Sequence, residues 1–289
     1  MLGYHVSKGK YKSMEIALAA AADNLSEYGF ARPCAQIFVS GPQSFRQNLT
    51  DEDIVKCCKV ATTRGLNLVI HGAYVDHPWN RAQGAVHNIK QELQVAAKLG
   101  ATGVIVHLGA GAANDASLET VLKAVGDLPE KVLDRVILWL EINAAKPTDA
   151  TYETPEKITR LFERVHAVGS PLRVGLCIDT AHLYSCGIAL DSMIAARRWL
   201  EGLPNVPIML HLNDSASLLG SGIDRHQTLL EGNIWKDYHP VTGDLAIEDS
   251  GLIELVNYAE RNNIMVVLER NDDGLAPDLV LLQQLGYFQ

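Results

Sequence analysis

One apolar run of the sequence ends in a carboxylate, and an imidazole follows close behind. The run Val174–Ile178 is short, which is typical of a buried strand. Asp179 follows it directly and His182 stands three residues further on, so we expect both to lie in the loop after this strand. Carboxylate oxygens and neutral imidazole nitrogens are ligands for a borderline metal such as zinc. A capping aspartate near a surface histidine would give the same letters, so this motif alone leaves both interpretations open.

The same arrangement recurs where five other apolar runs end. These residues are His71, His107, Glu141, His211 and Glu269, with Asp224 and His226 on the segment that follows His211. Each one alone is more often a hydrogen-bonded polar residue at the edge of a core. Six strands that end the same way by chance are far less expected. Buried carboxylates and imidazoles packed together repel one another or cost desolvation unless a cation compensates.

Nine such side chains are too many for one tetrahedral zinc held by three protein ligands and a water. They suit two or three metal ions with a shared carboxylate. Two metals about 3.5–4 Å apart can stabilise both the attacking and the leaving oxygen of an in-line displacement. The sequence contains neither a G-x-S-x-G nor a P-loop motif, so no separate protein nucleophile is indicated. Such a site could carry out phosphoester hydrolysis.

Eight apolar runs alternate with eight longer, mostly amphipathic stretches. The expected strands are Leu2–Val6, Ala35–Val39, Leu68–Ile70, Gly103–Val106, Val136–Leu140, Val174–Ile178, Pro207–Leu210 and Ile264–Leu268. The expected helices are Ser13–Tyr28, Ile54–Arg64, Asn80–Leu99, Ser117–Val125, Thr154–Val168, Asp191–Leu200, Gly251–Asn262 and Pro277–Leu285. This alternation predicts an α/β fold, a single (β/α)8 TIM barrel over residues 1–289, with its active site at the carboxyl ends of the strands. The irregular stretch Ser215–Asp249 is expected to be a long functional loop.

Composition sets further limits. The 289 residues are 47% hydrophobic and 20% charged, an ordinary globular balance. Five cysteines with no C-x-x-C pair, no apolar stretch near 18 residues and no signal-peptide core in Met1–Tyr11 predict a soluble, intracellular, cytoplasmic protein without a membrane partner. The net charge of −9 argues against a simple basic nucleic-acid coat. Three divalent cations would bring it to about −3 and concentrate positive charge in one cleft.

Several short sequence motifs resemble those of the endonuclease IV family of apurinic/apyrimidinic endonucleases, also called AP endonuclease family 2. The resemblance extends from Gly3 to Glu269. The motifs are His71–Tyr74, Leu140-Glu141, Cys177–His182, His211–Asp214, Asp224–His226 and Glu231–Ile234. The resemblance implies three zinc ions: the first on His71, His107 and Glu141; the second on Glu141, Asp179, His211 and Glu269; the third on His182, Asp224 and His226. It implies Glu141 and Glu269 as catalytic carboxylates. It also implies a monomer that cleaves duplex DNA 5′ to abasic sites, in base excision repair, and removes 3′ blocking groups.

The chain departs from the usual family strings at two strand ends. His107-Leu108-Gly109 replaces His-Pro-Gly, and Glu269-Arg270-Asn271 replaces Glu-Thr. With Val75–Trp79, these variants resemble the form encoded by large DNA viruses, which would place the protein in the host cytoplasm or the virion. Gln43 stands where the family places a DNA-inserting arginine, so either Gln43 or Arg46 is expected to fill that role.

Other DNA contacts are expected on the rim. Tyr74, three residues after His71, is expected to wedge into the base stack at a missing base, and Trp79 or Trp235 could serve as well. The alternative, that these rings pack between loops, is at least as good for the two tryptophans. Arg225 and His5 are counted among the residues near DNA. The lysines of the first loop fit phosphate contacts or a solvated charge run equally well; they are Lys8, Lys10 and Lys12.

Two other functions remain open. A metal-dependent sugar isomerase or epimerase of the same barrel type would use Glu141, Asp179, His211 and Glu269, and it would leave the third ligand group without a role. A non-enzymatic barrel that binds damaged DNA would have no chemical reason to keep every ligand. The number of bound metal ions separates the first alternative from the nuclease, and a nicking assay separates the second.

Overall fold

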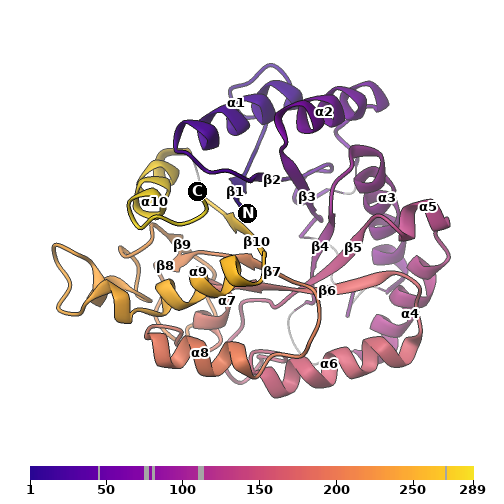
Figure 1. Cartoon of the computed structure of the whole chain (residues 1–289). Helices are drawn as coiled ribbons and strands as arrows, with labels where there is room; N and C mark the ends of the chain where they lie inside the picture. The colour runs from indigo at the N-terminus through magenta and orange to yellow at the C-terminus, as the bar shows by residue number, and fades with distance from the viewer. Residues whose placement is uncertain (45, 75–77, 80–81, 110–113, 271) are drawn as a thin grey trace.

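The structure is a computed structural model that describes every residue except 45, 75–77, 80–81, 110–113 and 271. Eight parallel strands close into a barrel in the order β1, β10, β7, β6, β5, β4, β3, β2. These strands are β1 (Leu2–His5), β2 (Pro33–Ile37), β3 (Asn67–His71), β4 (Gly103–His107), β5 (Ile137–Glu141), β6 (Arg173–Asp179), β7 (Ile208–His211) and β10 (Met265–Leu268). The predicted (β/α)8 TIM barrel is therefore confirmed (Figure 1).

Helices surround the barrel (Figure 1). The longer ones are α1 (Met14–Glu27), α2 (Asp51–Arg64), α3 (Ala82–Leu99), α4 (Asp115–Gly126), α6 (Pro155–Val168), α8 (Met193–Glu201), α9 (Gly251–Arg261) and α10 (Asp272–Gln284). Two short helices, α5 (Glu130–Leu133) and α7 (Thr180–Ser185), were not expected, because so few residues carry no readable period. Helix α10 begins at Asp272, so Pro277 lies inside it and the predicted start at this proline is wrong.

The helix ends follow local signals in the sequence. The Thr50 side chain accepts a hydrogen bond from the Asp53 backbone (3.2 Å), and the Asp53 side chain accepts one from the Thr50 backbone (2.9 Å), which together form a capping box. Gly100, after α3, has φ +71°, a left-handed conformation that glycine adopts without strain. Ser13 directly precedes α1, but its side chain makes no capping hydrogen bond.

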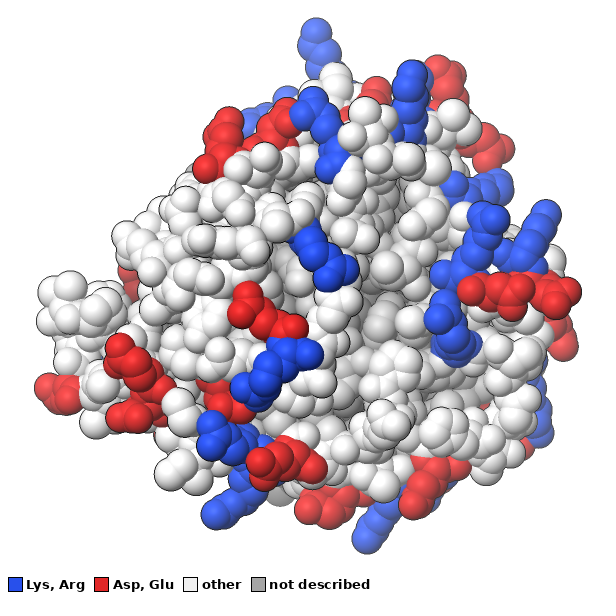
Figure 2. All heavy atoms as spheres, in the orientation of Figure 1, with Lys and Arg blue, Asp and Glu red and all other residues white. Residues whose placement is uncertain are grey.

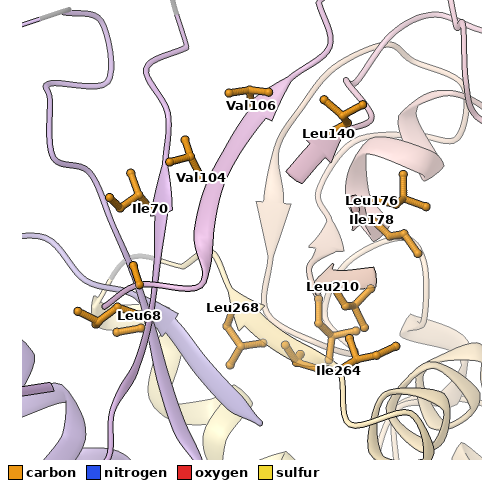
Figure 3. Close-up of a cluster of buried hydrophobic side chains, with 14 of the residues drawn as sticks. Leu68, Ile70, Val104, Val106, Leu140, Leu176, Ile178, Leu210, Ile264 and Leu268 are labelled. Carbon is orange, nitrogen blue, oxygen red and sulfur yellow. The ribbon is translucent and has the colours of Figure 1, made fainter. Parts of the chain in front are cut away.

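Side chains of the barrel strands alternate between two cores, because successive residues of a strand point to opposite faces. The layer between barrel and helices includes Leu68, Ile70, Val104, Val106, Leu140, Leu176, Ile178, Leu210 and Leu268 (Figure 3). The barrel interior holds Cys34, Val69, Ile105, Trp139, Cys177, Met209, Met265 and Val267. The Trp139 ring lies over Gly175, where an added Cβ would come within 2.6 Å of the ring. The barrel interior is therefore tightly packed, and it supports the side chains at the carboxyl ends of the strands.

The stretch expected to be a long loop does carry little regular structure. It holds two short paired strands, β8 (Asp214–Ser215) and β9 (His226–Gln227), and two 3-10 turns, η1 (Lys236–Tyr238) and η2 (Ile247–Asp249). Within the described part of the chain, no helix has the length and apolarity needed to cross a membrane. On the face shown in Figure 2, basic and acidic side chains are interspersed rather than gathered by sign.

Candidate metal centre

The inward-facing position at the carboxyl end of each barrel strand holds a polar residue. Around the ring these are His5, Gln36, His71, His107, Glu141, Asp179, His211 and, just beyond β10, Glu269. Each stands two residues after an inward residue of the layer below, such as Val69, Trp139 or Val267. The pleat of the strands therefore turns six of the nine expected ligands toward one point.

The Glu141 carboxylate lies at the middle of this point and is fully buried. Its Oε2 is 3.2 Å from His71 Nε2 and 3.1 Å from His107 Nε2. Its Oε1 is 3.1 Å from His211 Nδ1 and 3.3 Å from His182 Nδ1. The two oxygens thus face different histidines, an arrangement in which one carboxylate can join two metal ions.

Two groups of ligand atoms share Glu141. In each, the atoms lie within 4.8 Å of one another; the groups are His71, His107 and Glu141, and Glu141, Asp179, His211 and Glu269. In the second group, His211 Nδ1 is 3.2 Å from Glu269 Oε2 and 3.8 Å from Asp179 Oδ2. The structure thus brings together the sets expected for the first and second metals.

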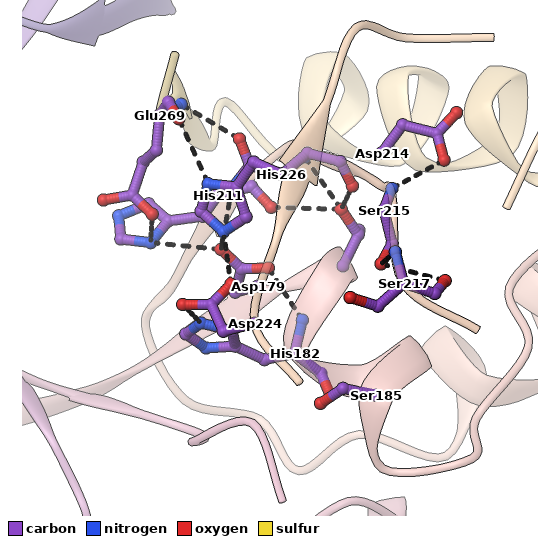
Figure 4. Close-up of polar contacts among 12 residues, drawn as sticks. Asp179, His182, Ser185, His211, Asp214, Ser215, Ser217, Asp224, His226 and Glu269 are labelled. Atoms are coloured by element: carbon purple, nitrogen blue, oxygen red, sulfur yellow. Dashed lines mark hydrogen bonds and ion pairs between the residues drawn. The ribbon is translucent and has the colours of Figure 1, made fainter. Parts of the chain in front are cut away.

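The third group draws on a loop as well as on the barrel. His182 and His226 lie within ligand distance of Asp179. Asp224 reaches the same histidines from the loop before β9, with Oδ2 3.2 Å from His182 Nε2 and Oδ1 3.0 Å from His226 Nε2 (Figure 4). Asp179 Oδ2 is 3.6 Å from His226 Nε2. The expected trio therefore meets, and Asp179 lies between it and the second group.

His182 lies in the short helix α7, so the prediction that it stands in a loop is wrong. Asp179 Oδ1 accepts a hydrogen bond from the His182 backbone N–H at 2.9 Å and so caps the short helix α7. The capping interpretation and the ligand interpretation of this motif are therefore compatible. The helix fixes His182 in a buried position, 2% exposed, instead of leaving it on the surface.

Backbone carbonyls orient three of the histidine rings. His71 Nδ1 lies 2.8 Å from the carbonyl of the next residue. His182 Nδ1 lies 2.8 Å from the Ile142 carbonyl, and His226 Nδ1 lies 3.1 Å from that of Glu269. An Nδ1–H donated to these oxygens leaves each Nε2 free to bind a metal ion.

Gln36 is a site residue that the sequence analysis missed. Its Oε1 lies 2.8 Å from His211 Nε2, and its Nε2 donates to Glu269 Oε1 at 2.5 Å. Its Nε2 also lies 3.3 Å from His5 Nδ1. An amide is not a metal ligand of the expected kind, so the residue type of Gln36 gave no indication of a role in the site. The alternation along β2 could have found it, because Gln36 occupies the inward position after Cys34.

Asp214 holds the segment that carries Asp224 and His226. Its buried carboxylate accepts backbone N–H bonds from four residues; they are Ser215 at 2.7 Å, Leu230 at 3.1 Å, Gly232 at 3.3 Å and Ile234 at 2.9 Å. A Cβ at Gly232 would come within 2.3 Å of Asp214 Oδ1, so only glycine admits this approach. The loop that delivers the third group is thus tied to the end of β7.

The mutual field of these groups shifts their pKa values strongly. Burial alone would raise the pKa of Glu141, but His107 and His211 outweigh it and hold that pKa well below its usual value. Burial alone would lower the pKa of His211 and of His226. Carboxylates led by Glu269 outweigh burial at His211 and raise its pKa to about 9. Carboxylates led by Asp179 do the same at His226 and raise its pKa to about 10. The centre therefore favours ionised carboxylates beside positive charge, which either protons or metal ions can supply.

The donor set fits metal cations. His226 Nε2 is buried and makes no hydrogen bond of acceptable geometry with any described residue, although it faces two carboxylates. Cys177 also lies within ligand distance of Glu141 and His211. Burial raises the pKa of the Cys177 thiol well above its usual value, and a protonated thiol is a poor ligand. The imidazole and carboxylate groups are therefore the better sites.

Comparisons with known proteins agree with this geometry. A family model described as a xylose isomerase-like TIM barrel matches residues 22–255. A probable AP endonuclease of African swine fever virus is 35% identical over 286 residues, covering 94% of this chain and 92% of the viral protein. The chain belongs to AP endonuclease family 2.

A second relative and a solved structure are also similar to this chain over most of its length. Endonuclease 4 of Thermus thermophilus is 29% identical over 259 residues, covering 86% of this chain and 88% of that protein. The crystal structure of AsfvAP:AG superposes with a TM-score of 0.84 at 32% identity, covering 98% of this chain and 96% of that one. The chain therefore spans nearly the full length of an endonuclease IV-type hydrolase.

Of the residues expected near DNA in this family-2 chain, Tyr74 and His5 contact residues of the centre. The Tyr74 side chain is 40% exposed, and its ring centroid is 5.0 Å from that of His71 and 5.2 Å from that of His107. Gln43 and Arg46 are exposed on the loop after β2, and Arg225 is exposed next to Asp224. His5 is half-buried beside Gln36. Contact of these residues with DNA stays a prediction.

Two aromatic candidates were wrong. Trp79 is 2% exposed, and Trp235 is fully buried with its indole N–H donating to the Leu190 carbonyl at 2.9 Å. Both rings are part of the packing, so neither can enter a base stack. The strings around 75–77 and at Asn271, and Phe45 of the loop after β2, lie outside the described residues.

Proposed function

We propose that this chain is a zinc-dependent DNA repair endonuclease that hydrolyses the phosphodiester 5′ to abasic sites in duplex DNA. The products would be a 3′-hydroxyl and a 5′-deoxyribose phosphate, and 3′ blocking groups would leave by the same geometry. The observation that carries the proposal is the meeting of nine nitrogen and oxygen ligand side chains at one end of the barrel. Because all nine come from one chain, we expect a monomer to suffice.

Three zinc ions would be held by the three ligand groups. The first would bind His71, His107 and Glu141; the second Glu141, Asp179, His211 and Glu269; the third His182, Asp224 and His226. Bound there, zinc would supply the Lewis acidity that stabilises the attacking and leaving oxygens of a phosphodiester. The viral relative, which bears the name of a probable AP endonuclease, supports duplex DNA with an abasic site as the substrate.

The two carboxylates expected to be catalytic would act differently. Glu269 is 12% exposed, and Gln36 donates to its Oε1. Its Oε2 is therefore the oxygen that remains available to bind a metal ion or to take a proton from the attacking water. Glu141 is fully buried and faces four histidines, so its role is to fix the spacing of the groups.

The main alternative is a sugar isomerase or epimerase, since the family model is named for xylose isomerase-like barrels. Such an enzyme needs only the group of Glu141, Asp179, His211 and Glu269. It gives no role to Asp224, whose carboxylate reaches two histidines from a dedicated loop. We therefore favour the nuclease.

The deciding experiment is a nicking assay on a labelled duplex with one tetrahydrofuran abasic analogue, run beside the same duplex with an intact base. The metal content of the purified protein is measured on the same sample. We expect a single cut 5′ to the analogue, no cut in the control duplex and about three zinc ions per chain, one for each of the three imidazole and carboxylate groups described above. No incision after zinc is restored would refute the nuclease, and one metal per chain would favour the isomerase.

A further inference from the structure

A second cavity lies beside the metal centre. Its volume is about 570 Å³, and it is formed by the segment after β1 and the loop after β2. Most ligand pockets have volumes of about 300–1,000 Å³, so this one can take a nucleotide-sized group. Its inner wall includes His5 and Phe38, which also border the centre. Of its lining residues, His5, Lys8 and Lys12 were expected near DNA, but no part of the substrate has been assigned to the cavity itself.

One wall of the cavity is aromatic and continuous with the centre. The half-buried Phe38 ring lies 4.9 Å from the ring of His5, 5.2 Å from that of His71 and 5.4 Å from that of Tyr74, all measured between centroids. The apolar side chains of Val6, Met14 and Leu49 complete the lining. A flat aromatic face in an apolar slot suits a stacked nucleobase.

The other wall suits a phosphate group. Lys8 and Lys12 are exposed at the cavity, and Ser13 stands at the amino end of the 14-residue helix α1. The Ser13 hydroxyl is buried, does not cap the helix and has no hydrogen-bond partner among the described residues. The positive end of α1, two ammonium groups and a free hydroxyl donor therefore meet at one place.

The acidic residue of the lining does not oppose this assignment. Asp53 lines the cavity, but its Oδ2 accepts bonds from the Thr50 backbone N–H at 2.9 Å and from the Thr50 hydroxyl at 2.7 Å. These hydrogen bonds lower the pKa of Asp53 and turn its charge toward the start of α2. Lys8 makes a smaller contribution to the same lowering, and Lys12 lines the cavity as well.

We propose that this cavity binds one nucleotide of the DNA substrate, a neighbour of the abasic residue. Its base would stack on Phe38, and its phosphate would lie at Lys8, Lys12 and Ser13. The inference rests on the proposed nuclease function and adds a second recognition site to it. Such a site would hold the strand on one side of the lesion while Tyr74 fills the gap at the lesion itself.

The test is a double-mutant cycle between protein and DNA. The substrates are the abasic duplex and two derivatives that lack, in addition, the base on the 5′ or on the 3′ side of the lesion. The variant is Phe38→Leu, which keeps an apolar wall and removes the flat face. The matched control is Tyr28→Leu, a half-buried aromatic at the far end of α1 that stacks on Phe30.

We expect Phe38→Leu to lower kcat/KM on the standard duplex by roughly tenfold, within the range of base–aromatic stacking. The loss should largely vanish on the derivative that lacks the stacked base, while Tyr28→Leu leaves all three substrates unaffected. An equal loss on all three duplexes would mean that Phe38 only supports His71, and it would overturn the inference while the nuclease function stands. Absence of incision by the parent enzyme would overturn both.

The phosphate side has its own arm. Lys12→Ala should weaken DNA binding and reduce the slope of log affinity against log salt by about one unit. Lys123→Ala, on the surface of α4, is the control and should leave the slope unchanged. An unchanged slope for Lys12→Ala would remove the phosphate assignment. Competitive inhibition by free dAMP, without any base-dependent loss in Phe38→Leu, would assign the cavity to a mononucleotide and overturn the DNA proposal.

Discussion

The substitution Glu141→Gln tests the centre most directly. The amide keeps the size of the side chain, but it removes the negative charge and leaves a single good acceptor oxygen. In the structure, each Glu141 oxygen is about the same distance from two histidines, 3.1 to 3.3 Å. The variant can therefore serve at most one of the two groups that the carboxylate joins.

The magnitude follows from what is lost. Changes to residues that only orient a ligand cost about 10–100-fold in metal affinity or activity. Glu141 is itself a member of two ligand groups, and it is fully buried. We therefore expect the loss of at least one zinc ion and a fall in abasic-site incision of more than about 100-fold, or about 2.7 kcal/mol of transition-state stabilisation.

The assay measures incision rate and zinc content on the same preparation, with circular dichroism as a check of folding. Glu254→Gln is the matched control: a carboxylate that is 2% exposed and bound by Arg197 and Arg261 at 2.8 and 2.9 Å, on the outer helix α9. The control should lose stability but keep its metals and its rate per folded molecule. A Glu141→Gln protein with full zinc content and near-parental incision would refute both the bridging role and the three-zinc assignment.

Three further predictions concern the same centre. Gln36→Leu should weaken zinc binding about 10–100-fold in a chelator competition without unfolding the barrel, because His211 and Glu269 lose the amide that orients them; unchanged affinity would make Gln36 a packing residue. Zinc binding at pH 7 should release at least three protons, because a ligand nitrogen must be neutral. In the metal-free protein the pKa values of His211 and His226 are about 9 and about 10, and carboxylates led by Asp179 hold the pKa of His182 well above its usual value against the effect of burial. Affinity should thus rise with pH up to that range, and calorimetry in buffers of different ionisation heat checks the proton count; a count of zero would contradict it. Tyr74→Ala should weaken binding to abasic DNA by roughly 1–3 kcal/mol at unchanged metal content, and an equal affinity in a titration would show that the ring only packs.

The barrel and most of the centre could be predicted because two simple rules act together. Apolar runs of strand length mark the barrel, and the residue that ends each run on the inward face reaches the carboxyl mouth. His71, His107, Glu141 and His211 each follow this rule. Their chemical types then indicate a metal site, because four imidazole and carboxylate groups at one end of a barrel are costly to bury unless a cation compensates.

The missed features have physical reasons as well. Gln36 also occupies an inward-facing position near the carboxyl end of its strand, but its amide is uncharged and therefore does not indicate a metal ligand. The burial of Trp79 and Trp235 depends on how distant loops fold over them, which no local pattern records. The helix α7 has only six residues, so its existence depends on the Asp179 cap rather than on periodicity.

The three ligand groups differ in how firmly the fold holds them. The first two stand on strand ends above a packed interior, so their geometry is part of the barrel itself. The third depends on Asp224, whose side chain is 47% exposed on a loop that is tied down chiefly by the Asp214 carboxylate. Asp179 contacts both the second and the third group, at 3.8 Å from His211 and 3.6 Å from His226. A metal ion in the second group would therefore also hold Asp179 in place for the third group, so occupancy of the rigid strand-end site would favour occupancy of the loop-borne one.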